Sequence, residues 1–229
     1  MDSRSKTARL AGLIYLITVA TGLISLMYVP SQISGNGDAV ATVNNIAGFD
    51  WLFRLGVVAE SLQYLFFLLL GLVLYRLLGP VNRNAAVLMV ALVAVAVPMG
   101  FLAVANKLDV LSLLHGNVHR ALLAPDQLHA RVLFSIDAYY NRILVSELFW
   151  GLWLFPFGYL VFRSGFLPKA LGILLMAGCF SYLVTFFGQT LLPRHTIPDF
   201  VMWPVAIAEI ASCLWLLVVG ARPVGSTTK

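Results

Sequence analysis

Charge is scarce in this chain: Asp, Glu, Lys and Arg make up only 11% of its 229 residues, whereas 60% are hydrophobic. In a typical soluble domain about one quarter of the residues are charged. So few polar side chains cannot cover the surface of a water-soluble fold, which excludes a soluble globular protein. The composition instead predicts a single domain, residues 1–229, embedded in a lipid bilayer.

Cysteine is nearly absent as well, since Cys179 and Cys213 are the only two and no CxxC pair exists. Both lie within apolar runs, where a free cysteine packs as a small hydrophobic side chain. Motifs of a P-loop, a dinucleotide site or a kinase site are also missing. These absences argue against a disulfide framework and the common nucleotide-dependent enzymes, and we expect no cofactor.

The net charge of +5 does not indicate a nucleic-acid-binding protein. The basic residues stand singly or in pairs at the ends of apolar runs, and they form no basic helix face. We therefore expect the lipid bilayer, and no nucleic acid, as the partner of this chain. The sequence predicts no particular oligomeric state.

Six long apolar runs are present, and a membrane-spanning helix needs about 20 such residues. Pro and Gly mark the joints between them, as in Gly79-Pro80. The runs predict an all-α polytopic membrane protein with six transmembrane helices, at residues 10–30, 54–76, 85–106, 140–162, 169–190 and 199–220.

Two Asp residues extend this prediction to the outer side. Asp38 is a candidate N-cap of a short outer helix, and Asp126 is a candidate N-cap of a long fourth helix that runs to Phe162. At 1.5 Å per residue the fourth helix would be about 54 Å long, well beyond a hydrocarbon core of about 30 Å. It must either project outward or break near residues 137–142.

The basic residues are unevenly shared between the two ends of the predicted spans. The termini and the two short loops at residues 76–84 and 163–169 carry nine of the 15 Lys and Arg residues: Arg4, Lys6, Arg9, Arg76, Arg83, Arg163, Lys169, Arg222 and Lys229. Cytoplasmic loops are enriched in Lys and Arg. Both termini are therefore predicted to face the cytoplasm.

Several stretches are similar to a known bacterial membrane family. The segment "FWGLWLFPFGYLVFRSGFLPKALGILLMAGCFSYLV" resembles the signature of the family catalogued as domain of unknown function 4386. Similar stretches are "RLAGLIYLITVATGLI", "YRLLGPVNRNAAVL" and "EIASCLWLLVVG". The resemblance implies a six-helix fold and residence in the bacterial cytoplasmic membrane, and it implies no particular activity.

Three carboxylates interrupt the apolar runs: Glu60, Glu147 and Glu209. Helix rise places them about 24, 24 and 20 Å from the basic residues at the cytoplasmic ends of their spans. Each lies on a stripe of small or polar residues, which marks a helix contact face in a membrane. We therefore expect all three at a similar depth in the outer half of the bilayer, facing the bundle interior.

A charge at the bilayer centre costs at least about 2.5–3.5 kcal/mol, so the acids need a partner or a role. Gln63 shares the helix face of Glu60, and Tyr140 shares that of Glu147. Tyr140 and Arg142 belong to "DAYYNR", which is either an aromatic anchor at the interface or a gate above Glu147. The candidate ligand-binding or proton-carrying residues are Glu60, Gln63, Tyr140, Arg142, Glu147 and Glu209.

Three functions are compatible with these residues. The leading one is binding or transport of a small or lipid-like ligand in a pocket lined by the carboxylates. The second is an intramembrane enzyme that uses the carboxylates, either alone or with a divalent cation. The spans carry no His and no Glu-x-x-His motif, which argues against the metal-dependent form. The third is a structural or signalling protein whose acids pair across helices with basic residues such as Arg54, Lys107, Arg131 or Arg142.

A metal site outside the spans has only weak support. "HGNVH" places His115 and His119 four residues apart, which is the spacing of a helical zinc pair. The intervening Gly116-Asn117 is a poor helix interior. We therefore expect no metal site, with His115 and His119 as the weak candidates.

Overall fold

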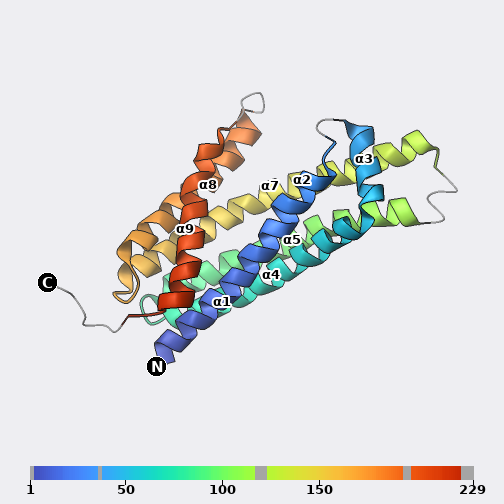
Figure 1. Ribbon diagram of the computed structural model, residues 1–229. Helices are drawn as coiled ribbons and strands as arrows, with labels where there is room; N and C mark the ends of the chain where they lie inside the picture. Colours follow the sequence, from blue (N-terminus) through green and yellow to red (C-terminus); the bar gives the residue numbers. More distant parts are fainter. Residues whose placement is uncertain (1–2, 36–37, 117–122, 193–196, 223–229) are drawn as a thin grey trace. The chain divides into compact units, whose positions relative to one another are not determined.

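The computed structural model describes residues 3–35, 38–116, 123–192 and 197–222. Of the residues that the structure describes, 89% are helical and none belongs to a strand. Six helices are long and apolar enough to cross a membrane: Ser3–Ile33, Asp50–Leu78, Arg83–His115, Pro125–Arg163, Lys169–Leu191 and Asp199–Val219. The prediction of an all-α protein with six membrane-spanning helices is thereby confirmed (Figure 1).

The first and last of these helices are composite. The first consists of α1 (Ser3–Leu23), the π-helical turn η1 (Ile24–Tyr28) and α2 (Val29–Ile33). The last consists of η2 (Asp199–Met202), α9 (Trp203–Leu214) and the π-helical turn η3 (Trp215–Val219). The other long helices are α4 (Asp50–Leu78), α5 (Arg83–His115), α7 (Pro125–Arg163) and α8 (Lys169–Leu191), and α3 (Ala39–Gly48) is the short outer helix.

The helices form two compact units. The first unit comprises Met1–Ile17, Phe66–Val97 and Val145–Lys229, and the second comprises Thr18–Leu65 and Pro98–Leu144. Helices α8 and α9 belong to the first unit, and α2 and α3 belong to the second. Helices α1, α4, α5 and α7 each contribute residues to both.

Within the first unit, close helix packing depends on glycine. A Cβ atom on Gly12 of α1 would lie 2.2 Å from the backbone nitrogen of Leu217 in η3. A Cβ atom on Gly158 of α7 would lie 2.6 Å from the carbonyl oxygen of Gly172 in α8. Small residues let helix backbones approach in this way inside membranes. Helix α8 also packs along α9, as Figure 1 shows.

Within the second unit, Pro30 explains the change in helix type between α1 and α2. Proline has no N–H group to donate, and its ring crowds the carbonyl four residues earlier. The wider π-helical turn Ile24–Tyr28 lies immediately before this position. In α3, the Asp38 carboxylate accepts hydrogen bonds from the N–H groups of Val40 and Ala41, so the predicted cap and short helix are confirmed.

Helix α7 begins at Pro125 and continues without a break to Arg163, a length of 39 residues. The expected long fourth helix is therefore present, and it does not break near residues 137–142. Pro98 and Pro156 lie inside α5 and α7, which continue through them.

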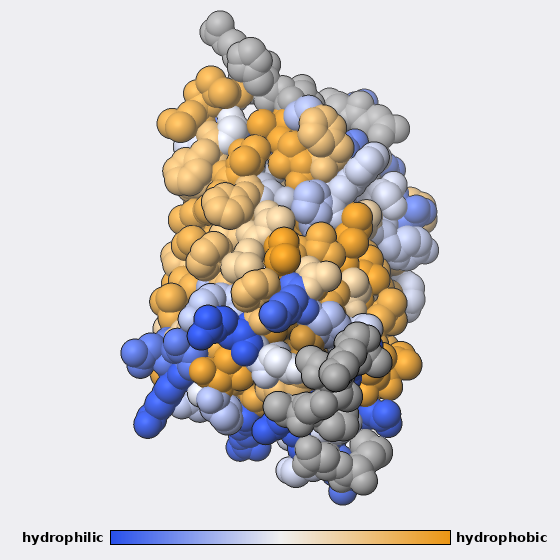
Figure 2. All heavy atoms as spheres, turned by 90° about the vertical axis from the view of Figure 1, so that its left-hand side faces the viewer, coloured by the Kyte–Doolittle hydropathy of each residue, from blue (hydrophilic) through white to orange (hydrophobic). Residues whose placement is uncertain are grey.

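Large apolar side chains are exposed on all six long helices, including Leu13, Leu65, Leu102, Phe134, Phe180 and Ile207. Figure 2 shows hydrophobic side chains over most of one face of the molecule. Exposed apolar surface of this extent would be unfavourable in water, and lipid is its natural solvent. The chain is therefore a multi-pass membrane protein in contact with the bilayer.

Candidate functional site

A buried ion pair lies inside the second unit. Glu60 of α4 is fully buried, and the Nζ atom of Lys107 on α5 lies 2.6 Å from its Oε2 atom. Lys107 is itself only 7% exposed. At this separation the ammonium group makes a charge-assisted hydrogen bond, which is stronger than a bond between neutral groups. The pair offsets part of the cost of removing two charges from water.

Two tyrosines complete the surroundings of the Glu60 carboxylate. The Tyr139 hydroxyl of α7 lies 3.2 Å from both carboxylate oxygens, and the Tyr64 hydroxyl of α4 donates to Oε1 at 3.4 Å. The Lys107 ammonium also lies 4.2 Å from the centre of the Tyr139 ring, in a cation–π contact. Three donors from three helices therefore surround one carboxylate.

The local sequence explains why these side chains meet. Glu60 and Tyr64 are four residues apart, so they lie one above the other on the same face of α4. The Tyr64 ring fits against α5 because position 100 is glycine: a Cβ atom there would lie 2.1 Å from Cζ of Tyr64. The neighbouring Phe101 ring contacts the Tyr64 ring at a centroid distance of 5.7 Å.

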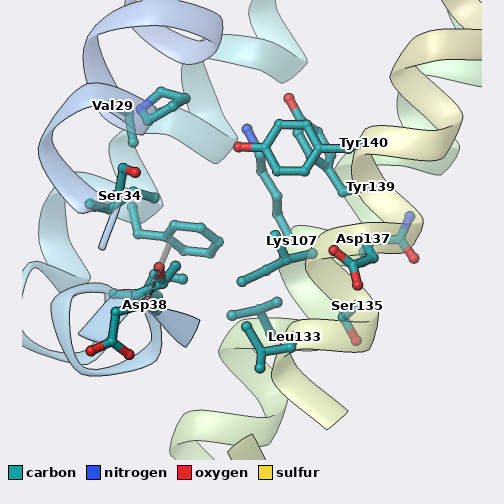
Figure 3. Close-up of a pocket in the computed structure, with 17 residues that line it drawn as sticks. Val29, Ser34, Asp38, Lys107, Leu133, Ser135, Asp137, Tyr139 and Tyr140 are labelled. Carbon is teal, nitrogen blue, oxygen red and sulfur yellow. Dashed lines mark hydrogen bonds between the residues drawn. The ribbon is translucent and has the colours of Figure 1, made fainter. Parts of the chain in front are cut away.

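A cavity of about 270 Å³ adjoins this cluster within the second unit. Lys107 and Tyr139 line it, so the ion pair forms part of its wall. Figure 3 shows Ser135, Asp137, Tyr139 and Tyr140 on the α7 side, with Val29, Ser34 and Asp38 on other segments. The volume is slightly below the 300–1,000 Å³ that is usual for small-molecule sites, which points to a small occupant.

The cavity lining is mixed in character. Apolar side chains such as Ile33, Ile46, Phe53 and Val110 supply about half of it. Polar groups include the Asn106 amide and the hydroxyls of Thr42, Ser135 and Tyr140. Binding sites for small molecules are commonly built this way, with apolar walls and a few polar groups that fix orientation.

Four of the predicted candidate residues lie in the second unit. Glu60 is the centre of the ion pair, and Tyr140 lines the cavity with its side chain about half exposed. The Gln63 side chain accepts a hydrogen bond from Ser25 at 3.3 Å and does not line the cavity. Arg142 is exposed and donates to the Leu102 carbonyl at 3.4 Å. The structure thus brings Glu60 and Tyr140 to the cavity region and gives Gln63 and Arg142 other contacts.

The remaining two acids, Glu147 and Glu209, belong to the first unit. Neither forms an ion pair within the described part of the chain, and Oε2 of Glu147 is buried without a hydrogen-bond partner there. The Tyr15 hydroxyl of α1 is buried in the same unit and has no hydrogen-bond partner among the described residues. These acids therefore lack the compensating cation that Glu60 has.

Of the two weak metal candidates the structure describes only His115, which belongs to no metal-binding cluster of described residues. A ring nitrogen of His115 lies 3.1 Å from the Leu111 carbonyl oxygen, and the other lies 3.3 Å from a carboxylate oxygen of Asp50. His119 lies outside the described residues. Among residues that the structure describes, no group of three His, Cys, Asp or Glu side chains could hold a metal ion.

Sequence reasoning missed Tyr139 as a site residue and considered Lys107 only as a counter-charge for a structural pair. Adjacent residues on a helix point about 100° apart, so only one of Tyr139 and Tyr140 could face Glu60. Nothing in the sequence shows which one does. The spacing of Glu60 and Tyr64 was a usable signal, because residues four apart share a helix face.

Comparison with known proteins gives one match. Residues 10–220 match the family model described as Domain of unknown function (DUF4386). No curated protein matches the chain, and no solved structure matches it. The matched region includes the stretches whose resemblance was noted in the sequence, apart from Arg9 at the start of the first, and it covers nearly the whole chain. The chain belongs to the DUF4386 family of proteins of unknown function.

Proposed function

We propose that this protein binds a small, lipid-like amphiphile in the cavity of its second unit. The observation that supports this most directly is the cavity itself, which joins apolar walls to a buried polar cluster. An amphiphile matches both parts of that lining. Binding of this kind is also the first step that a transporter would require.

The wall residues suggest how each part of the ligand would be held. An apolar chain would pack against side chains such as Ile33, Phe53 and Val110, where burial of apolar surface favours binding. The polar head would reach polar side chains of the lining, such as Asn106 and Tyr140.

The proposal includes a membrane and an orientation. We place the chain in the bacterial cytoplasmic membrane with both termini in the cytoplasm. The support is the concentration of Lys and Arg at the termini and in the loops at residues 76–84 and 163–169. With this orientation, the second unit contains the ends of α4 and α5 that lie furthest from those basic loops.

A structural role for the acids is the second candidate, and the Glu60 cluster is the observation that favours it. Lys107, Tyr139 and Tyr64 satisfy this carboxylate without any ligand. A buried pair of this kind can fix how helices pack, whatever the protein binds. An intramembrane enzyme using clustered carboxylates gains no comparable support from the described residues.

Filling the cavity separates the two candidates. Ile136→Trp places a larger side chain at a cavity-lining position, whereas the control Leu108→Trp changes a half-exposed position outside the cavity. We expect native mass spectrometry of the wild type and Leu108→Trp to show a co-purified small amphiphile that Ile136→Trp lacks. Thermal unfolding checks that each variant is folded. Identical bound content in the three proteins would contradict ligand binding and leave the structural role.

A further inference from the structure

We infer that the head group which this cavity selects is positively charged, so that the ligand is an amphiphile bearing an ammonium group. The inference rests on the proposed binding function and names its substrate class. It comes from the charges in the lining, from one carboxylate that has no partner among the described residues and from an exposed aromatic ring.

The charged residues at the cavity do not balance. Lys107, Asp38 and Asp137 line it. The charge of Lys107 is compensated by Glu60, which lies behind it at 2.6 Å. The two aspartates have no such counter-charge in the lining, so the acids Glu60, Asp38 and Asp137 outnumber the single lysine by two. This excess would repel an anionic head group, and a cationic head group would compensate it.

Asp137 is the carboxylate best placed to contact a cation. It is exposed, it forms no ion pair or hydrogen bond with any described residue, and Figure 3 shows it on the α7 side of the cavity. Asp38, in contrast, already accepts two backbone hydrogen bonds at the start of α3, at 2.9 and 3.1 Å. Asp38 adds negative potential, while Asp137 can pair directly.

Tyr140 supplies an aromatic surface three residues after Asp137, on the same face of α7. Its ring packs edge-on against Tyr139 at a centroid distance of 5.2 Å and stays about half exposed. The ring of Tyr139 already carries the Lys107 ammonium at 4.2 Å. Ammonium groups bind over tyrosine faces by cation–π attraction, so Tyr140 and Asp137 together form a suitable cation-binding pair.

The experiment compares two probes that share one alkyl chain and carry heads of opposite charge. Binding of a medium-chain alkylammonium and of the alkyl sulfate of the same chain length is measured on the purified protein by calorimetry. The same titrations on Ile136→Trp measure association outside the cavity, and that signal is subtracted. We expect the alkylammonium to bind in the cavity more tightly than the alkyl sulfate.

Charge variants test the assigned contacts. Asp137→Asn is expected to weaken alkylammonium binding by roughly two- to fivefold, as for an exposed ion pair, and Tyr140→Leu by a similar factor. The control is Asp126→Asn, which makes the same charge change on the same helix outside the cavity lining and should leave binding unchanged.

The outcomes distinguish the inference from the function on which it rests. If neither probe shows binding that Ile136→Trp removes, the proposed function is wrong. If both probes bind equally in the cavity and Asp137→Asn has no effect, only the inferred charge is wrong. A last comparison asks whether the ammonium belongs to a lipid head group or to a free amine. Alkylammonium binding is measured in nanodiscs of phosphatidylethanolamine and in nanodiscs of phosphatidylglycerol. Weaker binding in phosphatidylethanolamine means that this lipid competes for the site, whereas equal binding in both nanodiscs assigns the site to a free amine.

Discussion

Removing the charge of Glu60 is expected to destabilise the protein far more than removing the charge of Glu147. The variant Glu60→Gln leaves Lys107 buried, at 7% exposure, without the carboxylate that now lies 2.6 Å away. Breaking a buried pair by removing one partner costs about 3–5 kcal/mol. Glu147 has no ion pair among the described residues, so Glu147→Gln removes a charge that no cation compensates. We expect that variant to be neutral or slightly stabilising.

Thermal unfolding in a mild detergent measures this difference. For a chain of this length 1 kcal/mol shifts Tm by roughly 2–4 °C, so Glu60→Gln should unfold roughly 6–20 °C below the wild type. The double variant Glu60→Gln with Lys107→Met removes both charges and should recover much of the loss. Two results would refute the assignment of a stabilising pair. One is a Glu60→Gln protein with the same Tm as Glu147→Gln, and the other is a double variant whose Tm is no higher than that of Glu60→Gln.

Three further predictions concern packing, the hydrogen bonds of the site and topology. Gly12→Ala should lower Tm because its Cβ would overlap the Leu217 backbone. The control Gly48→Ala has open space around the new Cβ and should leave Tm unchanged, so equal Tm values for the two variants would contradict this packing. Tyr139→Phe removes the hydroxyl beside Glu60 and should cost about 1.5–3 kcal/mol, with Tyr140→Phe as the milder control in the same denaturation assay. Alkaline phosphatase fused to the C-terminus should be inactive and a fluorescent protein there active, since we place that end in the cytoplasm; the reverse result would overturn the orientation.

The spans could be predicted because they depend on local composition. About 20 apolar residues in a row predict a crossing whatever lies beside them, and the six runs are all present as helices. The Asp38 cap is equally local, since its partners Val40 and Ala41 follow within three residues. Features of this kind require no knowledge of which helix lies next to which.

The ion pair and the cavity could not be predicted in the same way. Glu60 and Lys107 are 47 residues apart, and the sequence offered several basic residues as equally good partners. Choosing among them requires the rotation of α4 and α5 about their axes. The cavity adds residues from α2, α3 and α7 to those from α4 and α5, so its existence depends on how five helices pack. Depth along a helix is readable from sequence, but the direction in which a side chain points across the bundle is not.

The glycine at position 100 has an evolutionary consequence. A Cβ atom there would lie 2.1 Å from the Tyr64 ring, and that ring carries a hydroxyl that donates to Glu60. Position 100 contributes no side chain to the site, yet a substitution there would displace one of the donors. Selection that preserves the Glu60 cluster should therefore act on both positions together. Among homologues, an alanine at the position of Gly100 should occur with a smaller residue at the position of Tyr64. Such covariation would be the evolutionary evidence of this contact.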